Sequence, residues 1–504
     1  MHMNLQKGQA LPLGIALIMF CALMGIVLFN TGQLASEKTR LANTADAAAY
    51  SGLIWQARTL NFEAYTNRAM VANQVAIGQI VSLVSWTEYG KITARNLDST
   101  IGWIPFLKPY TAAFRKAMNT VESVMQKVGR VAINVLDMVI GALSEVQEVA
   151  YNAAYLATPE VVKAVVERND KRYKVLSTAY SVGSLLANAS AWEKLAKQYS
   201  DDDMLMRKAD VIMKSRDRFT RDRGWGLSDI GIGLPNTVYI TWFLKVSMYK
   251  EGETRLIKEK KDSSSSGGGI LGGGAAAKSK WTWKGKDTLS LHVKTWGCDG
   301  WASCGWDHQE VPIGWGEAYI KQDVEYCEDK GSGGFFSWFL SSSGCPRWMK
   351  HNRLGERLAD REKEEIDADY DGVRAYYDLK DLSAKNKDPR LVLSIEVEAT
   401  GGDVRTASKV DGVGSSSASD KTLANGMGEG VFRVDDQLAS ESLVSISTAE
   451  VYFKRPEKLF VDGKERTEYA NLFNPYWQVR LTETSKARRY AAWAIRASDL
   501  ATKL

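Results

Sequence analysis

The sequence predicts an α+β protein in which a single N-terminal transmembrane helix continues into a long helical stalk or bundle, followed by a β-rich, antiparallel, disulfide-containing domain. Three observations lead to this prediction. Residues 10–29 are apolar and uncharged, a long stretch after them has helical periodicity, and alternating segments rich in aromatic and β-branched residues begin after about residue 225. At 504 residues the chain is also too long for one ordinary core.

The membrane helix is predicted from ALPLGIALIMFCALMGIVLF at residues 10–29. A run of about 20 apolar residues is long enough to cross a bilayer once. The run lacks the small-residue cleavage site of a secretory signal, which favours a retained anchor preceded by a short tail at residues 1–9. Basic residues lie on both sides of it, so charge alone leaves the orientation open.

The helical stalk or bundle is predicted over residues 30–225. No proline separates Pro109 from Pro159, and apolar residues recur there at steps of three and four. This period predicts a long amphipathic helix with coiled-coil character. Pro159 after Thr158 predicts the start of a further helix, with helical structure continuing to about residue 222. The apolar positions are Val121, Val124, Val128, Val131, Val135, Met138, Ala142, Val146 and Val149.

The β-rich domain is predicted over residues 226–482, with a flexible Ser/Gly/Ala-rich loop at 260–280 and a closing helix at 483–504. Alternating or β-branched patterns mark its strands. The expected strands lie within 237–248, 281–296, 317–326, 391–400, 442–453 and 477–481.

Four cysteines cluster in this second half: Cys298, Cys304, Cys327 and Cys345. Their spacing contains no C-x-x-C pair, so two disulfides are favoured over an all-cysteine zinc site. The pairing 298–304 with 327–345 is the most local of three, and the sequence does not choose among them. Disulfides indicate an oxidising compartment. Together with the single membrane segment, they therefore predict a cytoplasmic N-terminus and about 470 residues on the far side of the membrane.

Small residues follow the anchor at helical spacing: Ala42, Ala45, Ala48, Ala49 and Gly52. Such a stripe lets two helix backbones approach closely, in lipid as well as in water. Two partners fit it. One is the chain's own second helix, and the other is a helix of another subunit.

The stretch RLANTADAAAYSGLIWQARTLN at residues 40–61 resembles the N-terminal region of the TadE/TadG-like family of the tight-adherence (Flp) pilus system. The matching residues are Arg40, Leu41, Asn43, Ala45, Asp46, Ala47, Ala48 and Ala49. The resemblance implies a component of pilus assembly in a Gram-negative bacterium, single-pass in the inner membrane with its N-terminus in the cytoplasm and most of the chain in the periplasm. Its implied partners are other pilus-assembly or pilin-like membrane proteins or copies of itself. The residues expected to carry helix packing and interaction are Arg40, Asn43, Ala45, Asp46, Ala48, Ala49 and Gly52.

A pilin-type precursor would carry Glu five residues after the cleaved glycine. Here Leu13 stands five residues after Gly8, so the pattern does not predict cleavage at Gly8.

One acidic string resembles a calcium loop. Asp367, Asp369 and Asp371 alternate before Gly372, as in an EF-hand, and Asp378 falls at position twelve. Arg374 stands where an aliphatic residue is usual, and Asp reaches less far than the usual Glu at position twelve. The alternative is a solvated acidic turn. No other cofactor is expected.

Enzyme chemistry is not indicated. The four histidines show no H-E-x-x-H spacing, and neither a nucleophile elbow nor a P-loop occurs. The net charge of +5 is small and the basic runs are mixed with acids, which argues against nucleic-acid binding. The sequence therefore predicts a non-enzymatic assembly component. The alternative function is a ligand-binding or adhesive head of a surface filament, with or without calcium.

Overall fold

A computed structural model describes residues 10–231, 235–258, 281–298, 304–320, 347–380, 388–399, 443–456 and 468–501. The chain divides into two compact units, each built from separated segments. Unit 1 comprises residues 1–64, 149–197 and 378–504, and unit 2 comprises residues 65–148 and 198–377. Each unit therefore takes helix from the first half of the chain and strands from the second.

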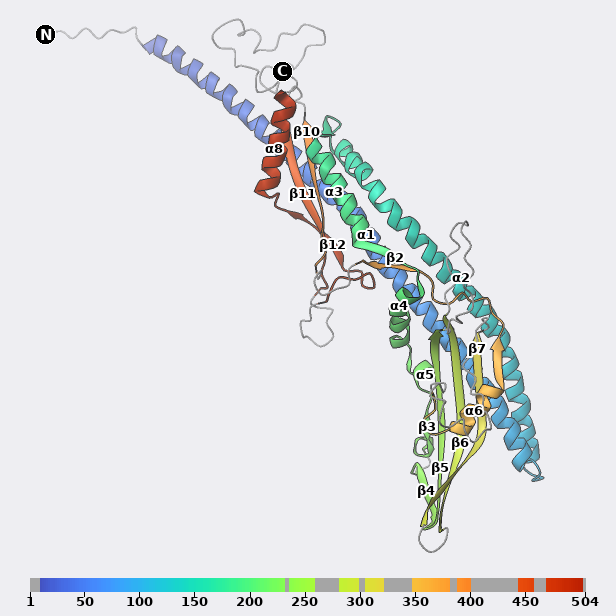
Figure 1. The fold of residues 1–504 in the computed structure, drawn as a ribbon. Helices are drawn as coiled ribbons and strands as arrows, with labels where there is room; N and C mark the ends of the chain where they lie inside the picture. The colour runs from blue at the N-terminus through green and yellow to red at the C-terminus, as the bar shows by residue number, and fades with distance from the viewer. Residues whose placement is uncertain are drawn as a thin grey trace, which may run out of the picture. The chain divides into compact units, whose positions relative to one another are not determined.

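The helices in chain order are α1 (Ala10–Ile101), α2 (Lys108–Asn169), α3 (Ala179–Leu195), α4 (Asp202–Lys214), α5 (Arg218–Arg221), the 3-10 helix η1 (Leu227–Ile230), α6 (Arg353–Arg361) and α8 (Lys486–Ala501) (Figure 1). The strands are β1 (Tyr173–Val175), β2 (Ala196–Tyr199), β3 (Trp225–Gly226), β4 (Thr237–Thr241), β5 (Leu244–Lys258), β6 (Trp281–Cys298), β7 (Cys304–Ile320), β8 (Lys363–Ile366), β9 (Tyr376–Leu379), β10 (Leu391–Ala399), β11 (Leu443–Phe453) and β12 (Trp477–Thr482).

Unit 1 contains an antiparallel sheet of order β1-β10-β11-β12. Helix α1 packs on this sheet and on the end of α2, because a Cβ atom at Gly52 would lie 2.7 Å from Val162 and 3.4 Å from Leu393. Buried hydrogen bonds also fix the position of α1 against its neighbours in unit 1. Gln56 Nε2 donates to Asn188 Oδ1 of α3 at 2.6 Å, and the side chain of Asn61 exchanges hydrogen bonds with the backbone of Trp477.

Unit 2 contains a sheet of order β3-β5-β6-β7-β8. Strand β4 pairs with residues 244–247 of β5, and β3 pairs with residues 249–250 on the same edge. The pairs β5–β6 and β6–β7 are long and antiparallel, whereas β7–β8 is parallel. The disulfide Cys298–Cys304 joins the ends of β6 and β7, where the two cysteines are register partners.

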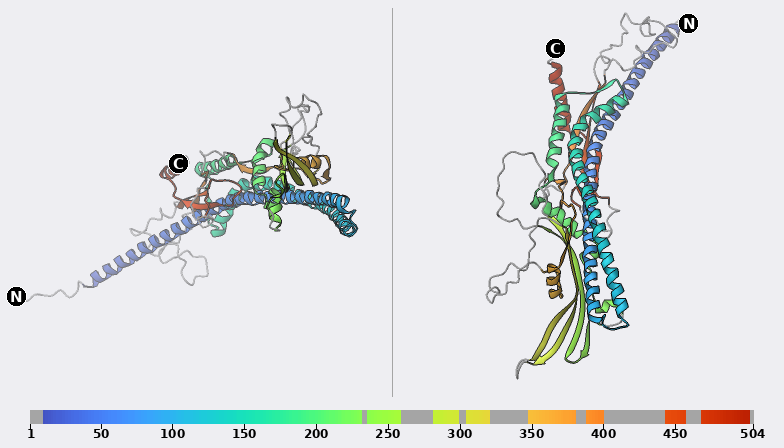
Figure 2. Two further views of the ribbon diagram at one scale, coloured as in Figure 1. Left: turned by 90° about the horizontal axis from the view of Figure 1, so that it is seen from below. Right: turned by 90° about the vertical axis from the view of Figure 1, so that its right-hand side faces the viewer.

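Helix α1 lies between this sheet and α2 in unit 2 (Figures 1 and 2). A Cβ atom at Gly78 would lie 2.8 Å from the Trp283 ring of β6, so glycine permits close contact with the sheet. On the other side of α1, a Cβ atom at Gly129 of α2 would meet Ile80 at 3.1 Å. Three layers result: sheet, α1 and α2.

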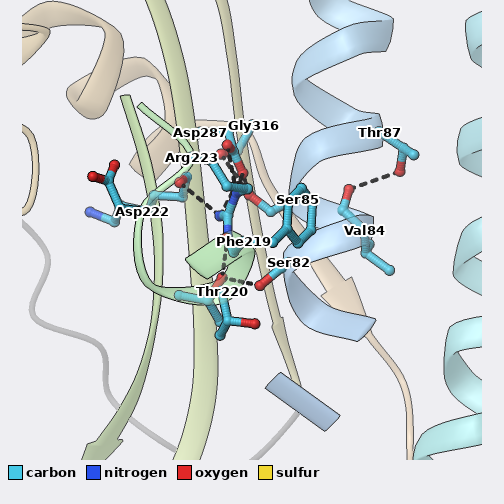
Figure 3. A network of polar contacts seen from close by, with 12 residues as sticks. Ser82, Val84, Ser85, Thr87, Phe219, Thr220, Asp222, Arg223, Asp287 and Gly316 are labelled. Carbon is cyan, nitrogen blue, oxygen red and sulfur yellow. Dashed lines mark hydrogen bonds and ion pairs between the residues drawn. The ribbon is translucent and has the colours of Figure 1, made fainter. Parts of the chain in front are cut away.

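A buried charge network fixes α1 to the sheet (Figure 3). Arg223 donates to Asp287 from Nε at 2.9 Å and from Nη2 at 2.8 Å, Lys250 also pairs with this carboxylate, and Ser85 Oγ of α1 donates to it at 2.7 Å. Burial by itself raises the pKa of Asp287, but the two cations lower it further than burial raises it, and the net pKa is below its usual value. The carboxylate is therefore charged in the folded protein.

The predicted fold class is confirmed, with α1, the strands and the Cys298–Cys304 disulfide in place. Cys327 and Cys345 lie outside the described residues. The structure divides the chain differently from the predicted order of a helical part at 30–225 and a β-rich part at 226–482, because α1 is long enough to serve both sheets.

One local prediction was wrong, and the strand segment at 237–248 is confirmed with a turn inside it. Pro159 lies inside α2 and does not start a new helix. A proline removes one helical N–H, and the flanking turns are fixed there by Val162 against α1 and by Gln56 Nε2 donating to Thr158 Oγ1 at 3.2 Å. Residues 237–248 form the hairpin β4–β5, because the turn at Trp242–Phe243 interrupts the run.

Candidate functional site

The first part of α1 is a candidate membrane span. It is apolar and long enough to cross a bilayer, and none of its most hydrophobic window is buried within the chain. Large side chains such as Leu11, Ile18 and Phe20 are more than half exposed. Among the described residues nothing covers this apolar window, which agrees with a membrane-anchored protein.

The small-residue stripe that follows is buried in unit 1. Ala45, Ala48 and Ala49 are fully buried, and Gly52 contacts Thr158 and Val162 of α2 and Leu393 of β10. Of the two partners expected from the sequence, the chain's own second helix is the one in contact here. These four residues therefore determine how α1 packs within its own unit.

The polar residues of the same stretch have three different environments. Ser447 Oγ donates to Asp46 Oδ1 at 2.6 Å, which ties α1 to β11. Arg40 is half exposed and lies 3.7 Å from Glu37 and 3.5 Å from Asp170. Asn43 is exposed. A partner of the stem can thus reach Arg40 and Asn43, whereas Asp46 is occupied within the unit.

The outer face of α2 in unit 2 carries an exposed apolar stripe, which we call the α2 seam. Its members recur at alternating steps of three and four from Phe114 to Ala142, and the large ones are 42–72% exposed. This is the heptad pattern of a coiled-coil contact. The α2 seam consists of Phe114, Ala117, Val121, Val124, Val128, Val131, Val135, Met138 and Ala142.

The opposite face of α2 is fixed, so the α2 seam cannot turn inward without breaking internal contacts. Gly129 lies against α1, and Gln147 Nε2 donates to Thr66 at 2.6 Å and to Asn67 at 2.9 Å. Arg374 Nη2 lies 2.9 Å from Asp137, the charged residue in the middle of the apolar run at 131–143. The helix is therefore apolar on two faces, and unit 2 covers one of them.

Three carboxylates of the predicted calcium loop, those of Asp367, Asp371 and Asp378, have protein partners, and Asp369 is held through its backbone. Arg130 lies 3.1 Å from Asp367, Arg374 pairs with Asp371, and the backbone N–H of Asp369 donates to Asn134. In unit 1, Asp378 Oδ1 accepts from the backbone N–H of Leu472 at 3.1 Å. Calcium binding by these residues stays a prediction.

One three-carboxylate cluster in the described part of the chain has oxygens close enough to share a cation: Glu88, Glu122 and Glu364. Lys91 lies among them, with its Nζ 2.7 Å from Glu88 and 3.5 Å from Glu122. Burial raises the pKa of Glu88 even with Lys91 present. The ammonium of Lys91 thus already offsets one charge of the cluster.

Sequence reasoning found the period of the α2 seam but not its exposure, because a 3–4 repeat is equally typical of a helix face turned to a core. No signal in the sequence separates the two without knowing which face α1 takes.

Residues 8–59 match the family described as "Putative Flp pilus-assembly TadE/G-like". The match confirms the resemblance noted for the N-terminal region and covers about a tenth of the 504 residues. It supports a role in Flp/Tad pilus assembly. Neither the curated proteins nor the solved structures contain a match to the chain.

Proposed function

Because residues 8–59 match the TadE/G-like family, we propose that this chain is a non-enzymatic, membrane-anchored component of a Tad/Flp-type pilus assembly or secretion system. It acts through helix packing and protein–protein contacts in the periplasm of a Gram-negative bacterium. The exposed apolar start of α1 supports the anchor. The Cys298–Cys304 disulfide supports an oxidising compartment for the sheet of unit 2, and hence a cytoplasmic N-terminus in the inner membrane.

The observation that carries a contact function is the α2 seam. Its exposed apolar area is on the order of 700 Å², above what soluble monomers usually leave uncovered and close to the roughly 800 Å² per partner of a standard interface. Covering it with a second apolar heptad helix would remove that area from water. The partner is therefore a helix with the same 3–4 repeat, from another copy of this chain or from another membrane protein of the assembly.

Charged residues lie beside the α2 seam and at its end, but not within it. Lys127 and Glu148 are exposed beside the seam, and Glu145 falls on the next heptad position after Ala142. An acidic side chain inside an apolar seam is unfavourable to bury. The strict alternation of three and four thus ends at Ala142, although Val146 and Val149 beyond it are also exposed.

Photo-crosslinking tests the proposal in cells that make the pilus. A benzophenone amino acid is placed at Val131 in the full chain, with Ser123, exposed on the same helix but off the seam, as the matched position. We expect an adduct from Val131 alone, containing this chain or a pilus-assembly protein by mass spectrometry. Equal adducts from both positions, or none from Val131, would overturn the proposal.

Charged substitutions give the functional test. Val128→Asp with Val135→Asp should abolish adduct formation and piliation, because two carboxylates would have to be buried in the contact. Both valines are more than half exposed, so stability should change by no more than about 0.5 kcal/mol per site. Ser123→Asp is the control. Normal piliation in the double variant would refute the role of the seam.

The alternative function, a ligand-binding head, is favoured by one observation, a basic cleft on the sheet of unit 2.

A further inference from the structure

We infer that the cleft over strands β4–β7 of unit 2 is a binding site for an acidic saccharide. The cleft has a volume of about 840 Å³, within the roughly 300–1,000 Å³ typical of small-molecule sites. The inference does not rest on the proposed function, because the cleft and the α2 seam use different residues and are tested separately.

The floor of the cleft is one face of the sheet. Register partners in antiparallel strands point to the same face. Lys245 of β5 is opposite Lys294 of β6, and Lys294 is opposite His308 of β7. The row beside it is formed by Ser247, His292 and Glu310. Two lysines therefore meet directly across adjacent strands.

The charge of the cleft is not balanced internally. Lys294, Lys350 and Arg353 line it, and among the described residues none of them has an ion pair. The carboxylate in the lining, Glu310, already accepts from the backbone N–H groups of Leu354 at 2.8 Å and Gly355 at 2.9 Å. Like charges opposite one another destabilise a sheet. An anion between Lys245 and Lys294 would relieve that repulsion.

His292 and His308 form a hydrogen-bonded chain with Asn352. Asn352 donates from Nδ2 to the Tyr249 carbonyl at 2.8 Å, so its Oδ1 accepts from His292 Nε2 at 2.9 Å. His292 Nδ1 then accepts from His308 Nε2 at 2.8 Å. Burial first, and the neighbouring His292 and Lys294 next, lower the pKa of His308. The positive charge that meets a ligand therefore comes from the lysines and Arg353.

Aromatic rings supply the apolar side of the site. Lys245 Nζ lies 3.7 Å from the centroid of the Trp306 ring and 4.8 Å from that of Tyr239, and both rings line the cleft. Cations beside exposed aromatic rings suit a ligand that carries both a carboxylate and a puckered ring with C–H faces. The hydroxyls of Thr237 and Ser247 on the same floor suit sugar hydroxyls. An acidic sugar has all three features, whereas inorganic phosphate has only the charge.

Calorimetric titration of the full chain in detergent tests this assignment, with trigalacturonate as the probe. Maltotriose, inorganic phosphate and a hexaglutamate peptide are the other arms. We expect trigalacturonate to bind with a Kd below about 1 mM and at least about tenfold more tightly than each of the others. Maltotriose lacks the carboxylates, whereas phosphate and hexaglutamate lack the sugar ring and its hydroxyls, and each lost hydrogen bond to a charged group weakens binding by about that factor. Tighter binding of the peptide would assign the cleft to a protein partner. Equal binding of phosphate would reduce it to an anion site. Either result, or no binding of trigalacturonate, would overturn the inference.

The double variant Lys245→Gln with Lys294→Gln tests whether trigalacturonate binds in the cleft. It should weaken trigalacturonate binding at least about tenfold, while Lys163→Gln, at an exposed lysine of α2 in unit 1, should not. Removing opposed like charges should leave the melting temperature equal or higher, which separates lost binding from lost folding. Unchanged affinity in the double variant would refute the site. Crosslinking at Val131 should continue in this variant, so failure of one proposal is distinguishable from failure of the other.

Discussion

Glu63 makes the stability of unit 1 depend on pH in a direction that can be worked out. The side chain lies on α1, is fully buried, and has its pKa raised by burial from 4.5 to about 9. The folded chain thus holds a proton at pH 7 that the unfolded chain releases. Because the folded state binds more protons between pH 4.5 and about 9, its stability falls as pH rises through that window. Each pH unit costs about 1.4 kcal/mol, or about 3 kcal/mol between pH 5 and pH 7.

Glu63→Gln removes this cost, because the amide is neutral at every pH and similar in size. The variant should match the wild type near pH 5 and exceed it by about 3 kcal/mol at pH 7. Urea unfolding of the full chain in detergent, followed by circular dichroism at pH 5, 6 and 7, measures the difference. Glu160→Gln, at an exposed position of α2, is the control and should give parallel curves. Parallel curves for Glu63→Gln as well, or a wild type that gains on the variant as pH rises, would refute the reasoning.

Three further changes test the packing. Gly52→Leu should destabilise unit 1 by about 1–3 kcal/mol in the same urea assay, since its Cβ would lie 2.7 Å from Val162; an unaffected variant would show that the helices can separate there. Lys208→Met should stabilise unit 2 by about 2 kcal/mol at pH 7 and by less at pH 10. Burial lowers the pKa of Lys208 to about 7, so the wild type loses stability as pH falls from 10.5 to 7, and the lost hydrogen bond to the Arg374 carbonyl offsets part of the gain. Arg223→Met should cost about 3–5 kcal/mol by leaving Asp287 with fewer cations, and an unchanged melting temperature would contradict the network of Figure 3.

Local patterns predicted most elements, because a strand or helix leaves its period in its own residues. The alternating stretch at 281–296 is β6, the β-branched stretch at 442–453 is β11, and the C-terminal stretch at 483–504 contains α8. These features depend on neighbours in sequence, which is why one sequence suffices to find them. The clustering of cysteines indicates disulfides, but it leaves the pairing of Cys298 with Cys304 open, and that pairing is fixed by the strand register of β6 and β7.

Long-range pairing could not be predicted in the same way. Gln56 bonds to Asn188 and Asn61 to Trp477, contacts that join residues more than a hundred positions apart. The sequence around Gln56 and Asn61 has the same pattern as the sequence around an exposed polar residue of a helical stalk. The cleft is a similar case, since Lys245 and Lys294 meet only because the register of β5 and β6 makes them partners. Composition indicated a helical half and a β-rich half, but it carries no information on which strand segments cover which part of α1.

The positions of the buried and exposed faces suggest how the two helices divide their roles. The segment that matches the TadE/G-like family, residues 8–59, supplies the apolar start of α1 and then the alanines and Gly52 that hold α1 inside unit 1. Its small residues are already in contact with this chain, so a Leu there would disturb the unit before it disturbed any partner. The α2 seam begins at Phe114, outside that segment, and is covered by neither unit's own packing where it is described. Its large side chains are exposed along four heptads, and this is the surface that the proposed partner helix would cover. We therefore expect substitutions in the matched segment to act on folding and insertion, and substitutions in the α2 seam to act on assembly alone.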